Sequence, residues 1–142
     1  MANLSGQLTL LPAKTITAAL NPFVTDAFKF GAAFPKVITA QATFTYGSAG
    51  TTCKAWLQTS LDDGASWIDV ACFSFTTASA RKIAAVNNFV AITGAAVVVP
   101  TDGTLAADAI VNGVLGRWLR VKVITTGTYA DSTTLAILAQ VR

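Results

Sequence analysis

The stretch that decides the fold is residues 51–72, which read TTCKAWLQTSLDDGASWIDVAC. Two runs in which apolar residues alternate with other residues flank the polar turn Leu61-Asp62-Asp63-Gly64. Asp-Gly between such runs is a strong signal for a β-hairpin, because glycine accepts the positive φ that tight turns need. The pattern therefore predicts that this stretch folds back on itself as two antiparallel strands.

A fold-back centred between Asp62 and Asp63 defines the predicted register. Side chains repeat every second residue along a strand, so this register puts one apolar set on a single face. The predicted cross-strand pairs are Leu57 with Ile68, Ala55 with Val70, and Cys53 with Cys72. The opposite face is expected to carry Lys54, Trp56, Gln58, Trp67 and Asp69.

The composition of the chain indicates one domain whose surface is partly covered by partners. The chain has 142 residues, of which 53% are hydrophobic and 12% are charged. This charged share is about half the usual one, and exposed apolar surface commonly marks a contact with another molecule. All seven acidic residues are Asp. Abundant Thr and Val together with the absence of Glu favour strands over helices.

Turn signals recur every 8–12 residues and predict about eight to ten strands, which is typical of an antiparallel β-sandwich of the jelly-roll or immunoglobulin-like kind. Outside the hairpin, strands are expected at 4–11, 15–20, 24–30, 37–46, 118–125 and 133–141, and residues 82–93 fit two short strands or one bulged strand. Residues 105–111 fit either a strand or a short helical turn. We expect residues 1–22 to form an N-terminal strand or arm at a subunit interface, and residues 23–142 to form a single sandwich domain.

The hairpin turn resembles the Asp-box, an S-x-D-x-G-x-T-W hairpin that is found in sialidase propellers and other β proteins. The matching residues are Ser60, Asp62, Gly64, Ser66 and Trp67, with Ser66 in place of the usual Thr. The carboxylate of such a motif caps backbone N–H groups of the turn, and glycine takes the positive φ. We interpret the motif as a structural staple in preference to a sugar contact.

Two cysteines and a group of aspartates are the candidates for cross-linking or metal binding. The predicted register places Cys53 opposite Cys72, so a disulfide can form in an oxidising compartment, while two reduced, buried thiols are the favoured alternative. The chain has no His, and two cysteines do not complete a zinc site. Asp62, Asp63 and Asp69 lack the spaced loop and the bidentate Glu of an EF-hand, so no metal and no other cofactor is expected.

The three tryptophans and one basic cluster are the candidate binding residues. Trp56, Trp67 and Trp118 could form a platform for a carbohydrate, but tryptophan is also a common anchor of protein interfaces. We favour a sheet or subunit contact, with Trp56, Trp118 and Arg120 as interface residues. Arg117, Arg120 and Lys122 form the one cluster of basic residues. A nucleic-acid site would need a denser basic patch with interleaved aromatics, so nucleic acid is not expected as a partner.

Catalysis and membrane insertion are not expected. Without His or Glu, no Ser-His or Cys-His pair exists, and acid–base chemistry would fall to Asp, Lys, Tyr or Cys. The N-terminus lacks the basic and long apolar regions of a signal peptide. The chain contains no run of about 18 apolar residues, so no membrane span is predicted.

Two stretches resemble small structural proteins of tailed bacteriophage virions. One is WLQTSLDDGASWIDV at residues 56–70, and the other is GRWLRVKVITTGTYA with the following TTLAIL, at residues 116–138. The resemblance implies a β-sandwich that coats or cements a capsid, or that sits on the tail. It also implies a homo-oligomer, most often a trimer, that contacts the major capsid protein or other virion proteins.

Three functions follow from these observations, in order of preference. The first is a capsid cement or decoration subunit located in the virion, with lattice contacts made by residues 1–22. The second is a carbohydrate-binding module in which Trp56 and Trp67 stack on sugars. The third is a component of the tail or of the head–tail connector.

Overall fold

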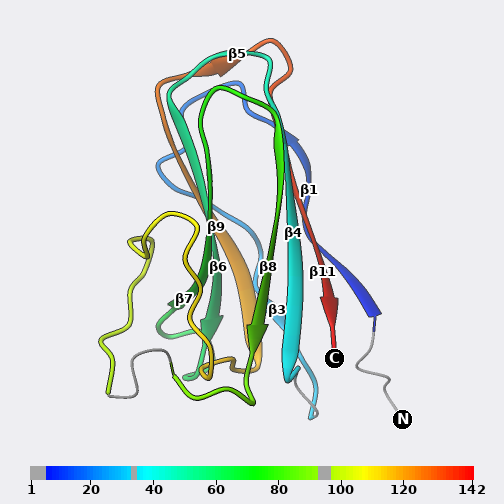
Figure 1. Ribbon diagram of the computed structural model, residues 1–142, viewed down its shortest axis with the longest axis vertical. Coiled ribbons are helices and arrows are strands. Elements are labelled where there is room, and N and C mark those ends of the chain that lie inside the picture. Colours follow the sequence, from blue (N-terminus) through cyan, green and yellow to red (C-terminus); the bar gives the residue numbers. More distant parts are fainter. Residues whose placement is uncertain (1–5, 33–34, 93–96) are drawn as a thin grey trace.

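The computed structural model of the protein describes residues 6–32, 35–92 and 97–142 (Figure 1). These ranges contain eleven β-strands in antiparallel sheets and no helix. The all-β prediction is therefore confirmed, and the strands form a sandwich. Within the same ranges, no helix is long and apolar enough to cross a membrane.

The first sheet contains four strands in the order β1-β11-β4-β8. They are β1 (Gly6–Thr15), β11 (Thr134–Val141), β4 (Val37–Thr45) and β8 (Ala80–Asn87). Every second residue of β4 and of β11 is buried, since one face of each strand packs on the core and the other faces outward. The alternation predicted for residues 37–46 is therefore confirmed.

The second sheet has the strand order β2-β9-β6-β7, and β3 also pairs with β9. Its members are β2 (Phe23–Val24), β3 (Phe28–Lys29), β9 (Trp118–Thr126), β6 (Thr52–Ser60) and β7 (Ile68–Phe75). The expected strand over 118–125 is confirmed as β9. The expected strand over 24–30 is instead broken into short pieces, with β2 and β3 each only two residues long.

One hydrophobic core lies between the two sheets. The Phe44 ring stacks on Phe75 with centroids 5.0 Å apart and meets Tyr129 edge-on at 5.5 Å. Tyr129 belongs to β10 (Tyr129–Ala130), which pairs with β5 (Ser48–Ala49) at the top of the view in Figure 1. Elsewhere the core contains fully or almost fully buried alanines: Ala40, Ala42, Ala55, Ala71 and Ala139. The high alanine content thus fits tightly packed sheet faces rather than a helix.

The N-terminal segment differs from the prediction. Pro12 was expected to end one strand before a second at 15–20, but β1 continues through Pro12 to Thr15. Proline is tolerated there because β1 is an edge strand, and the register with β11 shifts after Thr9 and after Leu11. Residues 6–15 belong to the four-stranded sheet, so this part of the predicted arm is integral to the sandwich. Residues 1–5 lie outside the described ranges.

The hairpin exists, but its predicted register was wrong. Cys53 pairs with Phe75 and Ala55 with Phe73, which moves the pairing by three residues. The loop between β6 and β7 spans residues 61–67, which is longer than a symmetric turn about Asp62 and Asp63 allows. A register shift next to Leu57 then adds Val70 as an extra residue on β7.

Two other segments also differ from the prediction. The one or two strands expected at 82–93 are the single strand β8, which ends at Asn87, and residue 93 lies outside the described ranges. Residues 105–111 form neither a regular strand nor a helical turn, although Ala71 and Ile110 make one isolated bridge. The last strand, expected at 133–141, is confirmed as β11.

Candidate functional site

The hairpin turn is stapled by a carboxylate, as the Asp-box pattern predicted. Asp62 accepts hydrogen bonds from the backbone N of Ser66 at 2.8 Å and from its Oγ at 2.6 Å. Ser60 Oγ donates to Asp62 Oδ1 at 2.8 Å and accepts from Gly64 N at 2.8 Å. Asp63 and Gly64 both have positive φ, at 56° and 86°. Hydrogen bonds from the Ser66 side chain and backbone lower the pKa of Asp62 to about 2.

Trp67, the last residue of the motif, is half-buried and carries a cation on its ring. The guanidinium carbon of Arg120 lies 4.2 Å from the ring centroid, and Arg120 Nε donates to Gln58 Oε1 at 2.7 Å. On the same strand as Arg120, Trp118 donates from Nε1 to Asp63 Oδ1 at 3.2 Å. Arg120 is therefore held by contacts within the chain, and the interface roles of Trp118 and Arg120 remain predictions.

Asp69 is the centre of a polar network that the sequence did not reveal. The residue is 1% exposed, and its carboxylate accepts hydrogen bonds from the backbone N atoms of residues 103, 104 and 105 at 2.8–3.1 Å. Thr101 Oγ1 and Gln58 Nε2 also donate to it, at 2.8 and 2.7 Å. A buried charge is tolerated only when such donors surround it. Asp69 thereby anchors residues 101–105 on the outer face of the second sheet.

Residues 101–111, which we name the strap, cover the free edge of β7. Asp69 N donates to Thr101 O at 2.8 Å, Cys72 N to Ala109 O at 3.0 Å, and Val111 N to Val70 O at 2.9 Å. The strap thus satisfies backbone groups that an edge strand would otherwise leave open to other chains.

The strap also buries Trp56, which is 4% exposed and donates from Nε1 to Leu105 O at 3.0 Å. The prediction that Trp56 lies in an interface was therefore wrong. The carbohydrate platform of Trp56 and Trp67 is excluded for the same reason, since Trp56 offers no accessible ring face.

An ion pair between Lys82 and Asp108 connects the strap to the four-stranded sheet. Lys82 of β8 donates to Asp108 Oδ2 at 2.7 Å and to Ser74 O at 2.6 Å. Asp108 Oδ1 also accepts from Ser74 N at 3.2 Å. Partial burial acts to raise the pKa of Asp108, but the Lys82 and Ser74 hydrogen bonds outweigh it and the net shift is downward. This side of the sandwich, at β7 and β8, is closed by the chain itself.

Two members of the basic cluster, Arg120 and Lys122 of β9, share one carboxylate, that of Asp102 in the strap. Lys122 Nζ lies 3.0 Å from Asp102 Oδ1, Arg120 Nη2 lies 3.7 Å from it, and Gln58 Nε2 donates to it at 2.7 Å. Partial burial acts to raise the pKa of Asp102, but these hydrogen bonds and positive charges outweigh it and lower the pKa. Two of the three clustered cations are thus paired within the chain.

The two cysteines cannot form, in this fold, the disulfide that the predicted register allowed; they are free and buried, as in the favoured alternative. Cys72 lies opposite Trp56, whereas Cys53 is three residues before Trp56 on β6 and points to the other face of the sheet. Burial raises the pKa of Cys53 to about 12 and also raises the pKa of Cys72, so both are expected to behave as small apolar residues.

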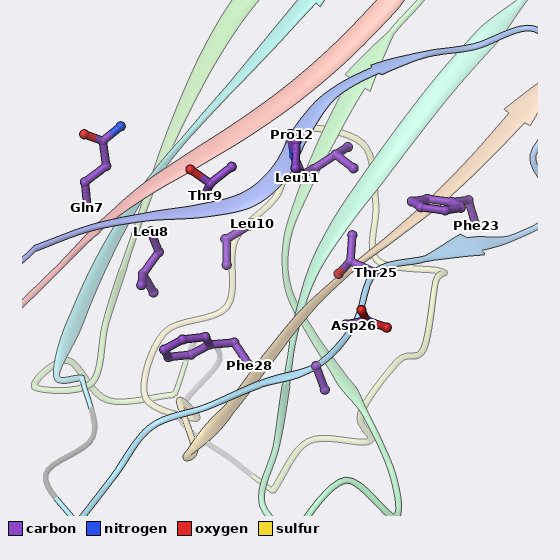
Figure 2. A pocket seen from close by; sticks show the side chains of 11 residues that line it. Gln7, Leu8, Thr9, Leu10, Leu11, Pro12, Phe23, Thr25, Asp26 and Phe28 are labelled. Atoms are coloured by element: carbon purple, nitrogen blue, oxygen red, sulfur yellow. The ribbon is translucent and has the colours of Figure 1, made fainter.

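The opposite side of the sandwich, between β1 and the β2–β3 segment, is open (Figure 2). A groove of about 520 Å³ is lined there by residues 7–12, 23 and 25–28. Leu8 and Leu10 point from β1 towards Phe28, whose side chain is exposed, while Gln7 and Thr9 point to the other side of the strand. In the described ranges, β1 pairs only with β11, and β2 and β3 pair only with β9.

The outer face of the four-stranded sheet carries almost no charge, and we name it the flat face. Its central row, from β8 to β1, is Ile83, Gln41, Leu138 and Thr9, and the flanking rows are Arg81, Thr43 and Ala136, and Ala85, Thr39, Gln140 and Gln7. Arg81 is the one charged residue among these eleven. Ile83 is 63% exposed and lies in the central row. A face with one charge among eleven residues is well suited to contact another protein, because only one ion has to be desolvated.

The comparisons with known proteins and the chemistry of the described residues assign no reaction. No family model matches the chain, and no curated protein matches it. Within residues 6–32, 35–92 and 97–142, no three His, Cys, Asp or Glu side chains are grouped so that they could hold a metal ion. The prominent features of the molecule are surfaces: the flat face, the open groove, and ten exposed large apolar side chains in the described ranges.

Proposed function

We propose that this protein is a structural subunit of a tailed-bacteriophage virion, and specifically a cement or decoration protein of the capsid. The observation that carries the proposal is the flat face, on which ten of eleven residues are uncharged and Ile83 is exposed at the β8 end of the central row. The resemblance of residues 56–70 and 116–138 to small virion proteins supports the same role.

The composition of the flat face is more typical of a protein contact than of a sheet face exposed to solvent. An outward face of an antiparallel sheet commonly alternates with the core and carries charged residues that keep the molecule soluble. Here Thr, Gln and Ala occupy those positions, and the apolar side chains of Ile83 and Leu138 lie in the same row. A partner surface of similar character, such as a capsid lattice, can bury this face with one charge to desolvate, provided that it supplies hydrogen-bond partners for the Gln and Thr side chains.

A cement protein acts by shape and by buried area, and it requires no active site. Binding across subunits of a shell stabilises the assembled state, because the bound protein lowers the free energy of that state alone. The partner is then the major capsid protein or another virion protein, and the location is the virion. In this role the flat face supplies the contact, and the strap and the hairpin staple preserve the fold.

The test is incorporation into particles. A phage lacking the gene is supplied in trans with tagged wild-type protein, with Ile83→Lys, or with the matched control Val24→Lys. Val24 is also exposed, at 37%, but lies on the other sheet. We expect wild type and Val24→Lys in purified virions at stoichiometric amounts. We expect Ile83→Lys to be reduced about tenfold or more, because an unpaired ammonium would be buried in the contact.

Two results would contradict the proposal. The first is that purified virions contain no tagged protein. The second is equal incorporation of Ile83→Lys and wild type, which would remove the flat face from the contact. Immunogold labelling of intact particles separates the alternatives within the virion: label over the head fits a cement protein, whereas label over the tail or its junction with the head indicates a tail or connector component.

A further inference from the structure

We propose that the flat face docks on a protein surface that carries carboxylates at two separate places, which pair with cations at the two ends of the face. The inference rests on the proposed function and deepens it, because it specifies the chemistry of the partner in the virion. The proposed function requires only that the partner cover a nearly uncharged face, whereas this inference requires acidic groups opposite each end.

Three exposed cations lie on the flat face or at its lower end in Figure 1, where β4 begins and β8 and β11 end. Arg81 belongs to the row at the other end. Arg142 pairs through its backbone with Val37, N to O at 3.0 Å, and alternation along the strand puts it on the outward face. Lys36 N donates to Arg142 O at 2.7 Å, and Lys36 Nζ lies 5.6 Å from the ring centroid of Phe89. In the part of the chain that the structure describes, none of the three cations forms an ion pair.

These three cations equal the net charge of the whole chain. The sequence has ten basic and seven acidic residues, for a formal net charge of +3. The seven other cations are therefore matched in number by the seven aspartates, so the excess of positive charge lies on one face and its lower end. Such an asymmetry attracts an anionic surface and orients the molecule as it approaches.

The seven aspartates lie on other parts of the molecule, and none belongs to the flat face. Three hold the strap, three in loops between strands accept hydrogen bonds, and one lines the groove beside β1. In that order they are Asp69, Asp102 and Asp108; Asp62, Asp63 and Asp131; and Asp26. A partner with carboxylates thus meets no carboxylate on the flat face.

The spacing of the cations favours separate carboxylates on a protein over a phosphate backbone. Arg81 lies six residues before Asn87 on β8, and the row of Asn87 includes Val37 and Arg142, so the two ends are roughly 20 Å apart. Between them the face presents Thr, Gln, Ala, Ile and Leu side chains. Nucleic acid carries closely spaced phosphates and is bound by dense basic patches, which this face lacks.

The two charged ends also give the contact a defined orientation. A carboxylate opposite Arg81 offsets the desolvation of the one ion within the flat face, and a carboxylate opposite Lys36 and Arg142 fixes the other end. Charges at the edge of a contact act mainly on the rate of association and are screened by salt. Binding to the virion should therefore weaken as the ionic strength rises.

The first test measures binding of the purified full chain to particles that lack the protein. We expect Arg81→Glu and Lys36→Glu each to weaken binding about tenfold or more, and Arg81→Lys, which keeps the charge, to bind within about threefold of wild type. Lys54→Glu is the matched control: it is the same charge reversal, on β6 of the other sheet, and should also bind within about threefold of wild type. Thermal unfolding verifies that each variant is folded.

The second test identifies the charged groups of the partner. Wild-type binding should weaken about tenfold between roughly 50 and 500 mM NaCl, and the double variant Arg81→Glu with Lys36→Glu should lose this dependence. Particles whose surface carboxylates have been converted to neutral amides with a carbodiimide should bind the wild type at least about tenfold more weakly. Nuclease-treated particles should bind it like untreated ones. Electron microscopy checks that the treated particles are intact.

Three results overturn the inference while the wild type still binds and Ile83→Lys does not, so that the proposed function survives. They are equal wild-type binding at both salt concentrations, folded Arg81→Glu and Lys36→Glu proteins that bind as tightly as wild type, and loss of binding after nuclease instead of carbodiimide treatment. If the wild type does not bind the particles at all, the proposed function fails and this inference fails with it.

Discussion

The two long sides of this sandwich solve the same problem differently. At β7 and β8, the strap supplies backbone partners for the edge strand, a buried carboxylate holds the strap, and Lys82 connects it to the other sheet. At β1 and at β2–β3, the chain leaves a groove and two edges without further strands in the described ranges. A protein that covers one edge so thoroughly can be expected to have the other covered from outside. The predictions below test the two sides separately.

The largest effect is expected from Asp69→Ala, which would break the closed side. Removing the carboxylate leaves three backbone N–H groups, Thr101 and Gln58 without their acceptor in a buried site. We expect the free energy of unfolding to fall by about 3 kcal/mol or more, as measured by urea denaturation. Asp63→Asn is the control, since Asp63 is exposed, accepts a hydrogen bond from Trp118 and has a positive φ that Asn tolerates. Equal losses for the two variants would contradict the role of Asp69.

The open side should respond to Thr25→Ala. Thr25 Oγ1 accepts from Val121 N at 2.9 Å, and Thr25 N donates to Val121 O at 2.9 Å, so this residue holds the segment between β2 and β3 on β9. The alanine variant leaves the Val121 amide unpaired, and we expect a loss of about 1–2 kcal/mol. Hydrogen exchange should speed up at residues 23–29 but not in the strap. Thr25→Ser keeps the hydroxyl and should behave like wild type.

A smaller effect is expected from Trp56→Phe, which sharpens the closed side without removing it. The substitution keeps an aromatic ring beneath the strap but deletes the indole N–H that donates to Leu105 O. We expect a loss of about 1 kcal/mol in the free energy of unfolding, measured by chemical denaturation. Trp118→Phe serves as the control, because its indole donates to the exposed Asp63. A loss for Trp118→Phe as large as that for Trp56→Phe would count against the strap contact.

The smallest effect is expected at the hairpin turn on acidification. The pKa of Asp62 is about 2 in the fold, below its ordinary 3.8, because Ser66 donates to the carboxylate. A depressed pKa stabilises the turn above the unfolded value, and this contribution is lost as the pH falls from about 4 to 2. The amide signal of Ser66 should report the change by NMR. In Asp62→Asn, this pH dependence should be absent; its persistence would assign the transition to another group.

How much of this fold could be predicted depended on whether the pattern was local. Strands β4 and β9 alternate between core and outward residues along their whole length, so their positions followed directly from the sequence. The hairpin was predicted from Asp63-Gly64 between two alternating runs, and the Asp62 carboxylate that holds its turn was identified correctly. Its register was not, because a seven-residue loop and the extra Val70 displaced the pairing, and neither has a clear signal in the sequence.

The features that matter most for the proposed interactions come from long-range packing. Asp69 was correctly placed with Gln58 on the outward face of the hairpin. The backbone N–H groups that donate to its carboxylate, however, lie more than 30 residues further on, in an irregular segment. Trp56 was on that same face and looked accessible until the strap covered it. The groove exists only because β1 and β2–β3 belong to different sheets, which strand patterns alone do not reveal. For the polar network, the hint available in the sequence was the carboxylate of Asp69 in the otherwise largely apolar strand β7.

The place of β11 in its sheet has a consequence for how the molecule comes into being. Residues 134–141 follow the other described strands in this sequence, yet they lie between β1 and β4 and pair with both. Gly6 pairs with Val141, so β1 gains its partner strand only after residue 141 has been synthesised, whereas β4 can pair earlier with β8. Contacts this distant along a chain are slow to form. During synthesis, β1 therefore has no partner strand and β4 has only β8, and unpaired strand edges of this kind are prone to aggregate.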